Sequence, residues 1–129
     1  MDNVRLARSW LYLSGVILIV VGILGFFSNP LVGPDGFVAT DNPHNIVHIL
    51  TGVLALGLAY AMRDDIGMAT LVFGALYLVV FVVTVVSPTL FGVFSVPVNV
   101  VDHVIHIGLA IVSLGLGYMA RGRSAVAAS

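Results

Sequence analysis

The chain has 129 residues, of which 60% are hydrophobic and only 9% are charged, and its formal net charge is −1. In soluble domains about a quarter of the residues are charged, so most of the outer surface of this chain is expected to face lipid. The near-zero charge argues against a nucleic-acid partner, and the lack of cysteine excludes disulfides and thiolate metal sites.

Four apolar runs follow one another along the chain, and each has the length of a membrane-spanning helix. We expect helices at about 10–27, 42–62, 67–86 and 100–120, in a single domain covering residues 1–129. A secretory signal peptide is the alternative for the first run, but the run is long and lacks a small-x-small cleavage motif, so we interpret it as a retained helix. The long loops at 28–40 and 87–98 are rich in proline and glycine, and the tail at 121–129 is expected to fray.

The second half of the chain repeats the first at an offset of 58 residues. Residues 41–63 align without a gap with residues 99–121, so that His48 matches His106 and Arg63 matches Arg121. The predicted fold class is therefore all-α. It is an integral membrane four-helix bundle made of two tandemly duplicated transmembrane hairpins, related by a two-fold axis along the membrane normal.

The arginines predict the orientation of this bundle. All five basic residues are arginines on one side of the four-span path, and the two long loops contain none. By the positive-inside rule, both termini are cytoplasmic in a multi-pass protein of the cell membrane, and the long loops lie outside. The lipid bilayer is the expected partner, and other membrane-protein subunits or a second copy of the chain are further candidates.

Small residues occupy the faces of the second and fourth helices that carry a histidine. In a helix, positions four, seven and eleven residues after a given residue lie on its face, and small residues there allow close approach of helices in lipid. We therefore expect these two helices to pack against each other through Gly52, Ala55, Ala59, Ala110, Ser113 and Gly117.

Polar residues share the first turns of the same two faces, namely His44, His48, Asp102 and His106. Three imidazoles and a carboxylate suit zinc, iron or copper, and the spacing of four residues places each pair on one helix face. The positive end of the helix dipole favours the neutral imidazole that a metal requires. This pattern predicts that His48 and His106 meet at the outer end of the bundle with Asp102 beside them.

The leading interpretation is a structural or accessory membrane protein, in which Asp102 complements the helix dipole and the two matched histidines form interhelical hydrogen bonds. The metal site is the alternative function. Haem between His48 and His106 is disfavoured by the lack of basic residues for its propionates. A transporter is disfavoured because no charge lies near mid-membrane, and no catalytic constellation indicates an enzyme. The remaining residues of the polar network are Asn45, Asn99 and His103.

Residues 45–52 (NIVHILTG) resemble a family of small four-helix bacterial membrane proteins, known as a domain of unknown function. The family's repeated signature is N-x-x-H-x-x-x-G in the second helix and N-x-x-D-x-x-x-H in the fourth, which Asn99, Asp102 and His106 match. Residues 73–77 (FGALY) resemble its third helix, and the likeness extends to Gly117. The resemblance implies the topology and no activity. His44 and His103 lie outside the pattern, so it points to Asn45, His48, Asp102 and His106 as the polar set.

Overall fold

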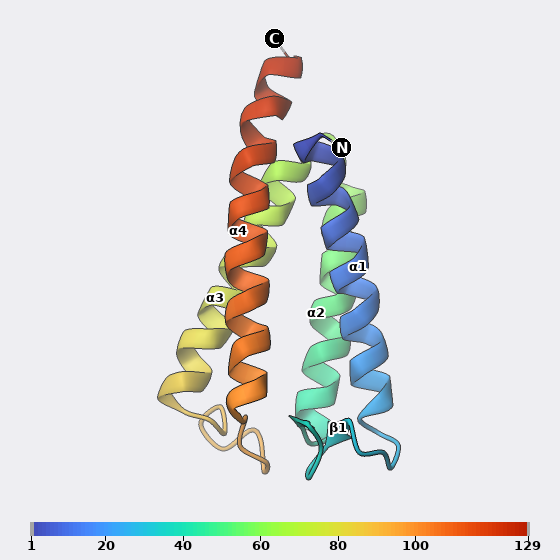
Figure 1. Cartoon of the computed structure of the whole chain (residues 1–129), viewed down its shortest axis with the longest axis vertical. Helices are drawn as coiled ribbons and strands as arrows, with labels where there is room; N and C mark the ends of the chain where they lie inside the picture. The colour runs from blue at the N-terminus through green and yellow to red at the C-terminus, as the bar shows by residue number, and fades with distance from the viewer. Residues whose placement is uncertain (1, 129) are drawn as a thin grey trace.

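The computed structural model describes residues 2–128, with side chains as far as Arg121. Its four long helices are α1 (Asn3–Leu24), α2 (Asn42–Ala61), α3 (Ile66–Val86) and α4 (Val100–Ala128). They run alternately up and down, and the start of α1, the α2–α3 turn and the end of α4 lie at one end of the bundle (Figure 1). All four are long and apolar enough to cross a membrane. The expected all-α, four-helix architecture is confirmed.

The observed helix boundaries differ from the expected ones at two places. α1 begins at Asn3 instead of residue 10, because the Asp2 carboxylate accepts a hydrogen bond of 2.8 Å from the backbone N–H of Arg5 and caps the helix. α4 continues to Ala128 instead of ending near 120, and the alanines and arginines of this segment have high helix propensity. The tail for which fraying was expected is thus drawn as a continuation of α4, and Ser129 lies outside the described residues.

A single asparagine organises the loop between α1 and α2. The side-chain amide of Asn29 donates to the carbonyls of Leu24 and Val32, and its oxygen accepts from the backbone N–H of Val32. The loop also contains a two-residue parallel pair, β1 (Val32–Gly33) with β2 (Val38–Ala39). Elements this short have no alternating pattern, so the sequence did not predict them.

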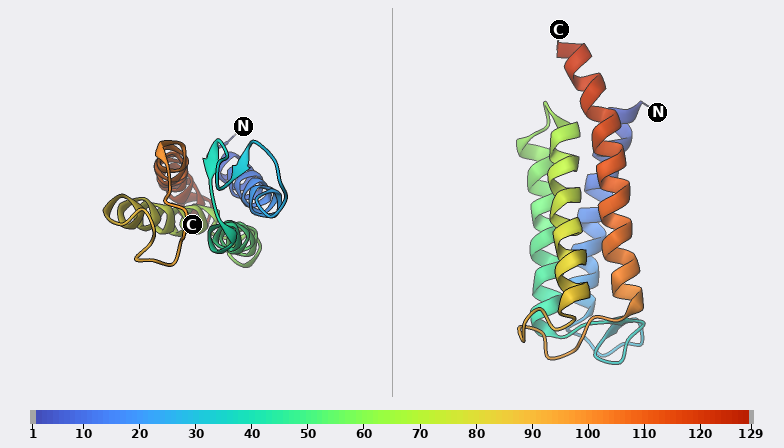
Figure 2. Two further views of the ribbon diagram at one scale, coloured as in Figure 1. Left: turned by 90° about the horizontal axis from the view of Figure 1, so that it is seen from below. Right: turned by 90° about the vertical axis from the view of Figure 1, so that its left-hand side faces the viewer.

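Helix packing is closest within each hairpin. α1 packs mainly on α2, and α3 packs mainly on α4, as the end-on view also shows (Figure 2). A Cβ on Gly52 would lie 2.6 Å from the carbonyl oxygen of Gly15 on α1, and a Cβ on Gly117 would lie 2.7 Å from the backbone nitrogen of Leu71 on α3. The expectation that the second and fourth helices pack directly through their small faces is therefore wrong. A helix face made of small residues indicates that another helix packs closely against it. Here that helix is the other member of the same hairpin.

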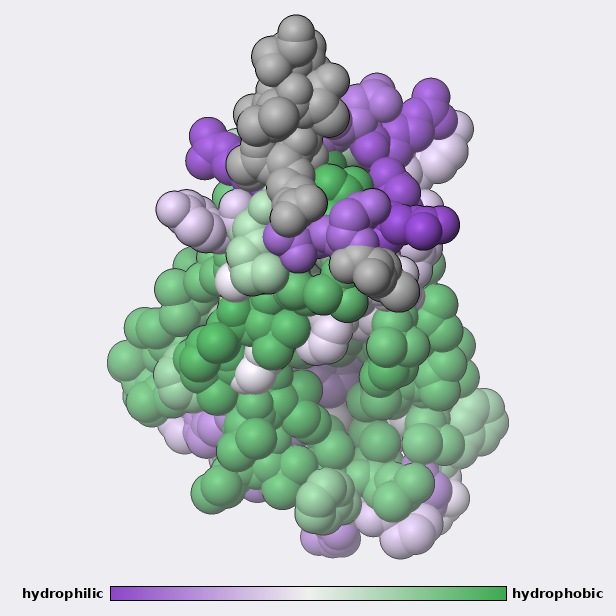
Figure 3. Space-filling view, turned by 45° about the horizontal axis from the view of Figure 1, so that its top comes forward, coloured by the Kyte–Doolittle hydropathy of each residue, from purple (hydrophilic) through white to green (hydrophobic). Residues whose placement is uncertain are grey.

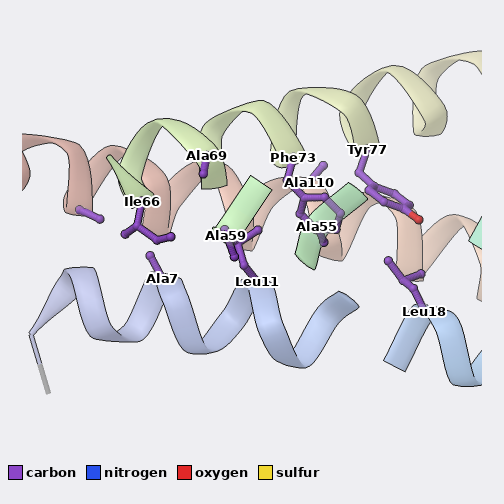
Figure 4. Close-up of a cluster of buried hydrophobic side chains, with 11 residues drawn as sticks. Ala7, Leu11, Leu18, Ala55, Ala59, Ile66, Ala69, Phe73, Tyr77 and Ala110 are labelled. Carbon is purple, nitrogen blue, oxygen red and sulfur yellow. The ribbon is translucent and has the colours of Figure 1, made fainter. Parts of the chain in front are cut away.

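The remaining small residues line the core between the hairpins. Ala55 and Ala59 of α2 and Ala110 of α4 are buried against the bulkier side chains of α1 and α3 (Figure 4). Two side-chain hydrogen bonds between helices tie the hairpins together along the core: the hydroxyls of Thr51 and Tyr77 lie 2.6 Å apart, and the Trp10 indole N–H donates to Ser113 over 2.8 Å. The whole cluster is Ala7, Leu11, Leu18, Ala55, Ala59, Ile66, Ala69, Phe73, Tyr77, Ala110 and Ala120.

The buried faces of α1 and α3 correspond at an offset of 59 residues. Gly15 faces Leu56 and Gly74 faces Leu114, so equivalent glycines meet equivalent leucines in the two hairpins. The buried positions of α1 at 7, 11, 14, 15 and 18 fall on those of α3 at 66, 70, 73, 74 and 77. The first helices of the two hairpins are thus shifted by one residue relative to the 58-residue spacing of α2 and α4.

The glycine contacts predict opposite effects for two substitutions in α2. Gly57→Ala faces open space and should stabilise the protein by about 0.5–1 kcal/mol through helix propensity. Gly52→Ala must displace the α1 backbone and should destabilise it by about 1–3 kcal/mol. Thermal unfolding in detergent, followed by circular dichroism, measures both. Equal effects of the two alanines would contradict the close α1–α2 packing.

Candidate functional site

Three histidines converge between the hairpins. His44 and His48 lie on successive turns of α2, and His106 lies in the second turn of α4. One ring nitrogen of each lies within 4.8 Å of the corresponding nitrogens of the other two. The three side chains are only 2%, 4% and 2% exposed. The structure thus places the matched histidines 48 and 106 together, with His44 in the same group.

Aromatic rings enclose this histidine cluster. His44 meets the edge of His48 with ring centroids 4.4 Å apart and stacks on Phe94 at 4.7 Å. The Tyr77 ring lies 6.0 Å from His106. Among the described residues, the Nδ1 atoms of all three histidines lack a hydrogen-bond partner. Phe94 comes from the second long loop, where no periodic pattern marks a buried side chain, so the sequence did not indicate it.

Asp102 lies beside the cluster and has a capping role. Its Oδ2 accepts the backbone N–H of Asn99 at 2.8 Å, and the Asn99 side chain accepts the backbone N–H of Asp102 at 2.9 Å. This reciprocal pair is a capping box at the start of α4. Asp102 is not among the residues whose ligand atoms lie within 4.8 Å of one another. Its Oδ1 is buried and has no hydrogen-bond partner in the described chain.

The other expected polar residues do not form one network with the histidines. Asn45 is fully buried between α1 and α2, where a Cβ on Gly25 would lie 2.0 Å from its Oδ1. His103, at the equivalent position of α4, turns its ring toward Phe81 of α3 with centroids 6.1 Å apart. Asn99 caps α4. Asn45 and His103 therefore both point into their own hairpin, away from the histidine cluster.

The caps of α2 and α4 cross to the opposite loops. The Asp41 carboxylate caps α2 through the backbone N–H of His44 at 3.0 Å and also accepts hydrogen bonds from Ser95 and Val96 in the second loop. In return, the Asn99 amide donates to the carbonyl of Phe37 in the first loop over 3.1 Å. Asp41 corresponds to Asn99, and Phe37 corresponds to Ser95, at the same offset of 58 residues. These reciprocal ties fix the turns of α2 and α4 that carry the histidines.

The ties also change the acidity of Asp41, which precedes the apolar span. Burial alone would raise its pKa, but the hydrogen bonds from His44, Val96 and Ser95 outweigh it and hold the pKa below the ordinary value of 3.8. The carboxylate is therefore ionised throughout the neutral range, as a cap at the positive end of a helix requires.

Two cavities flank the cluster. The larger, of about 200 Å³, lies between α1 and α4 and is bordered at one end by His48, Asp102 and His106. The smaller, of about 50 Å³, lies on the α3 side of the histidines. In the space-filling view, hydrophobic residues form the ridges on both sides of the hollow between the hairpins (Figure 3).

Fold and site define a class: a bundle of four apolar helices with three histidines buried between two hairpins. No protein-family model, no curated protein and no solved structure matches the chain.

Asp41 should make the stability of the bundle depend on pH. A carboxylate whose pKa is depressed on folding contributes its full stability above the unfolded pKa, near 3.8, and loses it as the pH falls through the folded pKa. The stability of the parent should therefore drop below about pH 4, and Asp41→Asn, which retains the cap without titrating, should drop less. Chemical unfolding in detergent from pH 7 to pH 3 measures the difference. Identical pH profiles would show that the crossing bonds do not depend on the charge.

Proposed function

We propose that the chain is an integral membrane protein that crosses the bilayer four times with both termini in the cytoplasm. The four apolar helices support this, as does the gathering of hydrophilic residues at the end of the bundle where α1 starts (Figure 3). Tyr60 and Tyr118 are 70% and 77% exposed near that end, and the Arg63 guanidinium lies over the Tyr60 ring. Exposed tyrosines beside arginines are typical of the membrane interface.

We also propose that the two hairpins arose by tandem duplication. The reciprocal bonds from Asp41 to the second loop and from Asn99 to the first support this origin, because a two-fold axis exchanges them. The equivalent glycine contacts of Gly15 and Gly74 support it independently.

The proposed topology can be tested with reporter fusions. A fusion after Ser129 should be active as a cytoplasmic reporter, and one within residues 28–40 should be active as an external reporter. Replacing Arg5 and Arg8 with glutamine leaves Arg63 in place and should retain this orientation in most molecules. A cytoplasmic signal from the 28–40 fusion would reverse the proposed orientation.

We propose that the function of the bundle is to bind a transition-metal ion at His44, His48 and His106. The observation that carries this proposal is the convergence of three buried imidazoles whose ring nitrogens lie within 4.8 Å of one another. In a tetrahedral zinc site, Zn–N distances of 2.0–2.1 Å separate neighbouring nitrogens by about 3.4 Å, so modest side-chain rotations would complete the site. Zinc, iron and copper all accept imidazole ligands.

A ligand explains the cluster better than a purely structural role does. Histidines that act as interhelical hydrogen-bonding groups need partners, and the Nδ1 atoms here have none in the described chain. A buried nitrogen without a hydrogen-bond partner costs about 1–3 kcal/mol, so three such Nδ1 atoms in one place favour a bound ion that would engage the rings. The cavities of about 200 and 50 Å³ are smaller than the pockets of roughly 300–1,000 Å³ that hold drug-sized ligands, which favours an ion over haem.

Metal binding should depend on the cluster histidines and not on their neighbour. The purified protein is expected to hold about one zinc ion per chain, and Co²⁺ in its place should give the visible spectrum of a tetrahedral site. His106→Ala should weaken binding by more than roughly 100-fold, since loss of a supporting residue alone costs 10–100-fold. His103→Ala is the matched control, because it removes an imidazole three residues away that is outside the cluster.

Elemental analysis and Co²⁺ titration of the three proteins in detergent provide the measurement. Equal metal content in the parent and His106→Ala would contradict the proposed site. A parent that binds no metal would leave the cluster as a packing element of a structural or accessory membrane protein.

A further inference from the structure

The larger cavity is long and lined mainly by apolar side chains. Along α1 it extends from Trp10 to Val21, which at 1.5 Å per residue is about 16 Å. Its sides are apolar, and Leu13 and Ile17 at its rim are 57% and 50% exposed, so it opens laterally toward the surface that we assign to lipid. A cavity of about 150 Å³ that is lined by apolar side chains in another protein binds benzene. The volume of about 200 Å³ available here therefore accommodates a single substituted ring.

The cavity arises from a difference between the two hairpins. At the 59-residue offset of the buried faces, Ser14 and Leu18 of α1 correspond to Phe73 and Tyr77 of α3. On the α3 side, Tyr77 lines a remaining space of only about 50 Å³. On the α1 side, the smaller Ser14 and Leu18 line the space of about 200 Å³. The duplicated architecture therefore does not by itself produce this cavity, since the residues of α1 leave it open.

The polar groups of the cavity are concentrated at one end. Asp102, which is 1% exposed, borders the cavity there, and its Oδ1 has no hydrogen-bond partner in the described residues. His48 and His106 border the same end. A buried carboxylate oxygen without a partner carries the desolvation cost of an unmade hydrogen bond, and a hydroxyl donor from a ligand would remove that cost. Charge-assisted O–H···O⁻ bonds are also among the strongest available in an apolar environment.

We propose that the cavity between α1 and α4 binds a small hydroxylated apolar molecule, of the size of a single-ring phenol, whose hydroxyl donates to Asp102 Oδ1. The ring lies among the apolar side chains of α1 and α4, and the ligand enters from the lipid through the rim at Leu13 and Ile17. The hydrogen bond of this site is made to Asp102, which is not a member of the histidine cluster, so the site does not require the metal.

Trp10 is the one tryptophan of the chain and borders the end of the cavity opposite Asp102, so a phenol that donates to Asp102 points its para substituent toward the indole. Brominated rings quench indole fluorescence, so the probes are 4-bromophenol and bromobenzene, which differ by the hydroxyl. The full chain in detergent with a chelator is titrated with each, at concentrations corrected for partition into the micelles. 4-Bromophenol should quench saturably, with an affinity about tenfold higher than that of bromobenzene, the effect of one hydrogen bond to a charged acceptor.

Three variants test the origin of this quenching. Ser14→Phe introduces the residue found at the equivalent position of α3 and should abolish the saturable component. Val16→Phe is its matched control, because Val16 is 51% exposed on the same helix and does not border the cavity. Asp102→Asn should reduce the preference for 4-bromophenol over bromobenzene severalfold. Circular dichroism of each variant verifies that the helices are retained.

The outcomes separate this proposal from the metal site. His44→Ala should lose metal and keep the saturable quenching, so failure of one proposal leaves the other testable. Linear quenching by both probes, or equal saturation in Ser14→Phe and the parent, would overturn the cavity site. Saturable quenching by lipids with brominated acyl chains but not by 4-bromophenol would also overturn it, since the occupant would then be a bilayer acyl chain.

Discussion

The crossing bonds at the N-terminal ends of α2 and α4 determine where the histidines lie. These two helices each pack on the first helix of their own hairpin, so close packing alone does not hold their N-terminal ends in register. Asp41 and Asn99 provide that register by joining each cap to the loop of the other hairpin. Because the bonds sit one to two turns before the imidazoles, a small shift at the caps would separate His48 from His106. The loops are thus part of the site, and the second loop also contributes Phe94, whose ring stacks on His44.

The glycine contacts explain why there is room for imidazoles between the hairpins. Had the small faces of α2 and α4 met each other, their backbones would have approached too closely for three rings to lie between them. Instead Gly52 and Gly117 bring each helix against its hairpin partner, and the space between hairpins holds alanines along the core and rings near the N-terminal ends of α2 and α4. The dipoles of α2 and α4 point their positive ends at the same region, which disfavours protonated histidine and favours a neutral, metal-binding form.

Much of the fold could be predicted from the sequence, because length and apolarity alone identify four helices, and the 58-residue repeat pairs them. The sequence could not predict which helices pack against each other, since a helix that is apolar all round does not show which face contacts another helix. The same limit explains the site. The spacing of His44 and His48 and the match of His48 with His106 indicated a shared cluster, whereas Asp102 turned out to bond Asn99 with one oxygen. Phe94 and Asn29 act through loop geometry, for which single-sequence patterns carry little information.

The difference between the hairpins gives the cluster two unequal sides. A symmetric bundle would place equivalent space on the α1 and α3 sides of the histidines, but Tyr77 lines one side and bonds Thr51, and Ser14 leaves the other open. His48 and His106 belong both to the cluster and to the wall of the open cavity. A metal held by three imidazoles retains an available coordination position, as catalytic three-histidine zinc sites do. Any molecule in the cavity would lie beside two of the proposed metal ligands, so the affinities of the two proposed sites would be linked through His48 and His106 by a reciprocal coupling free energy.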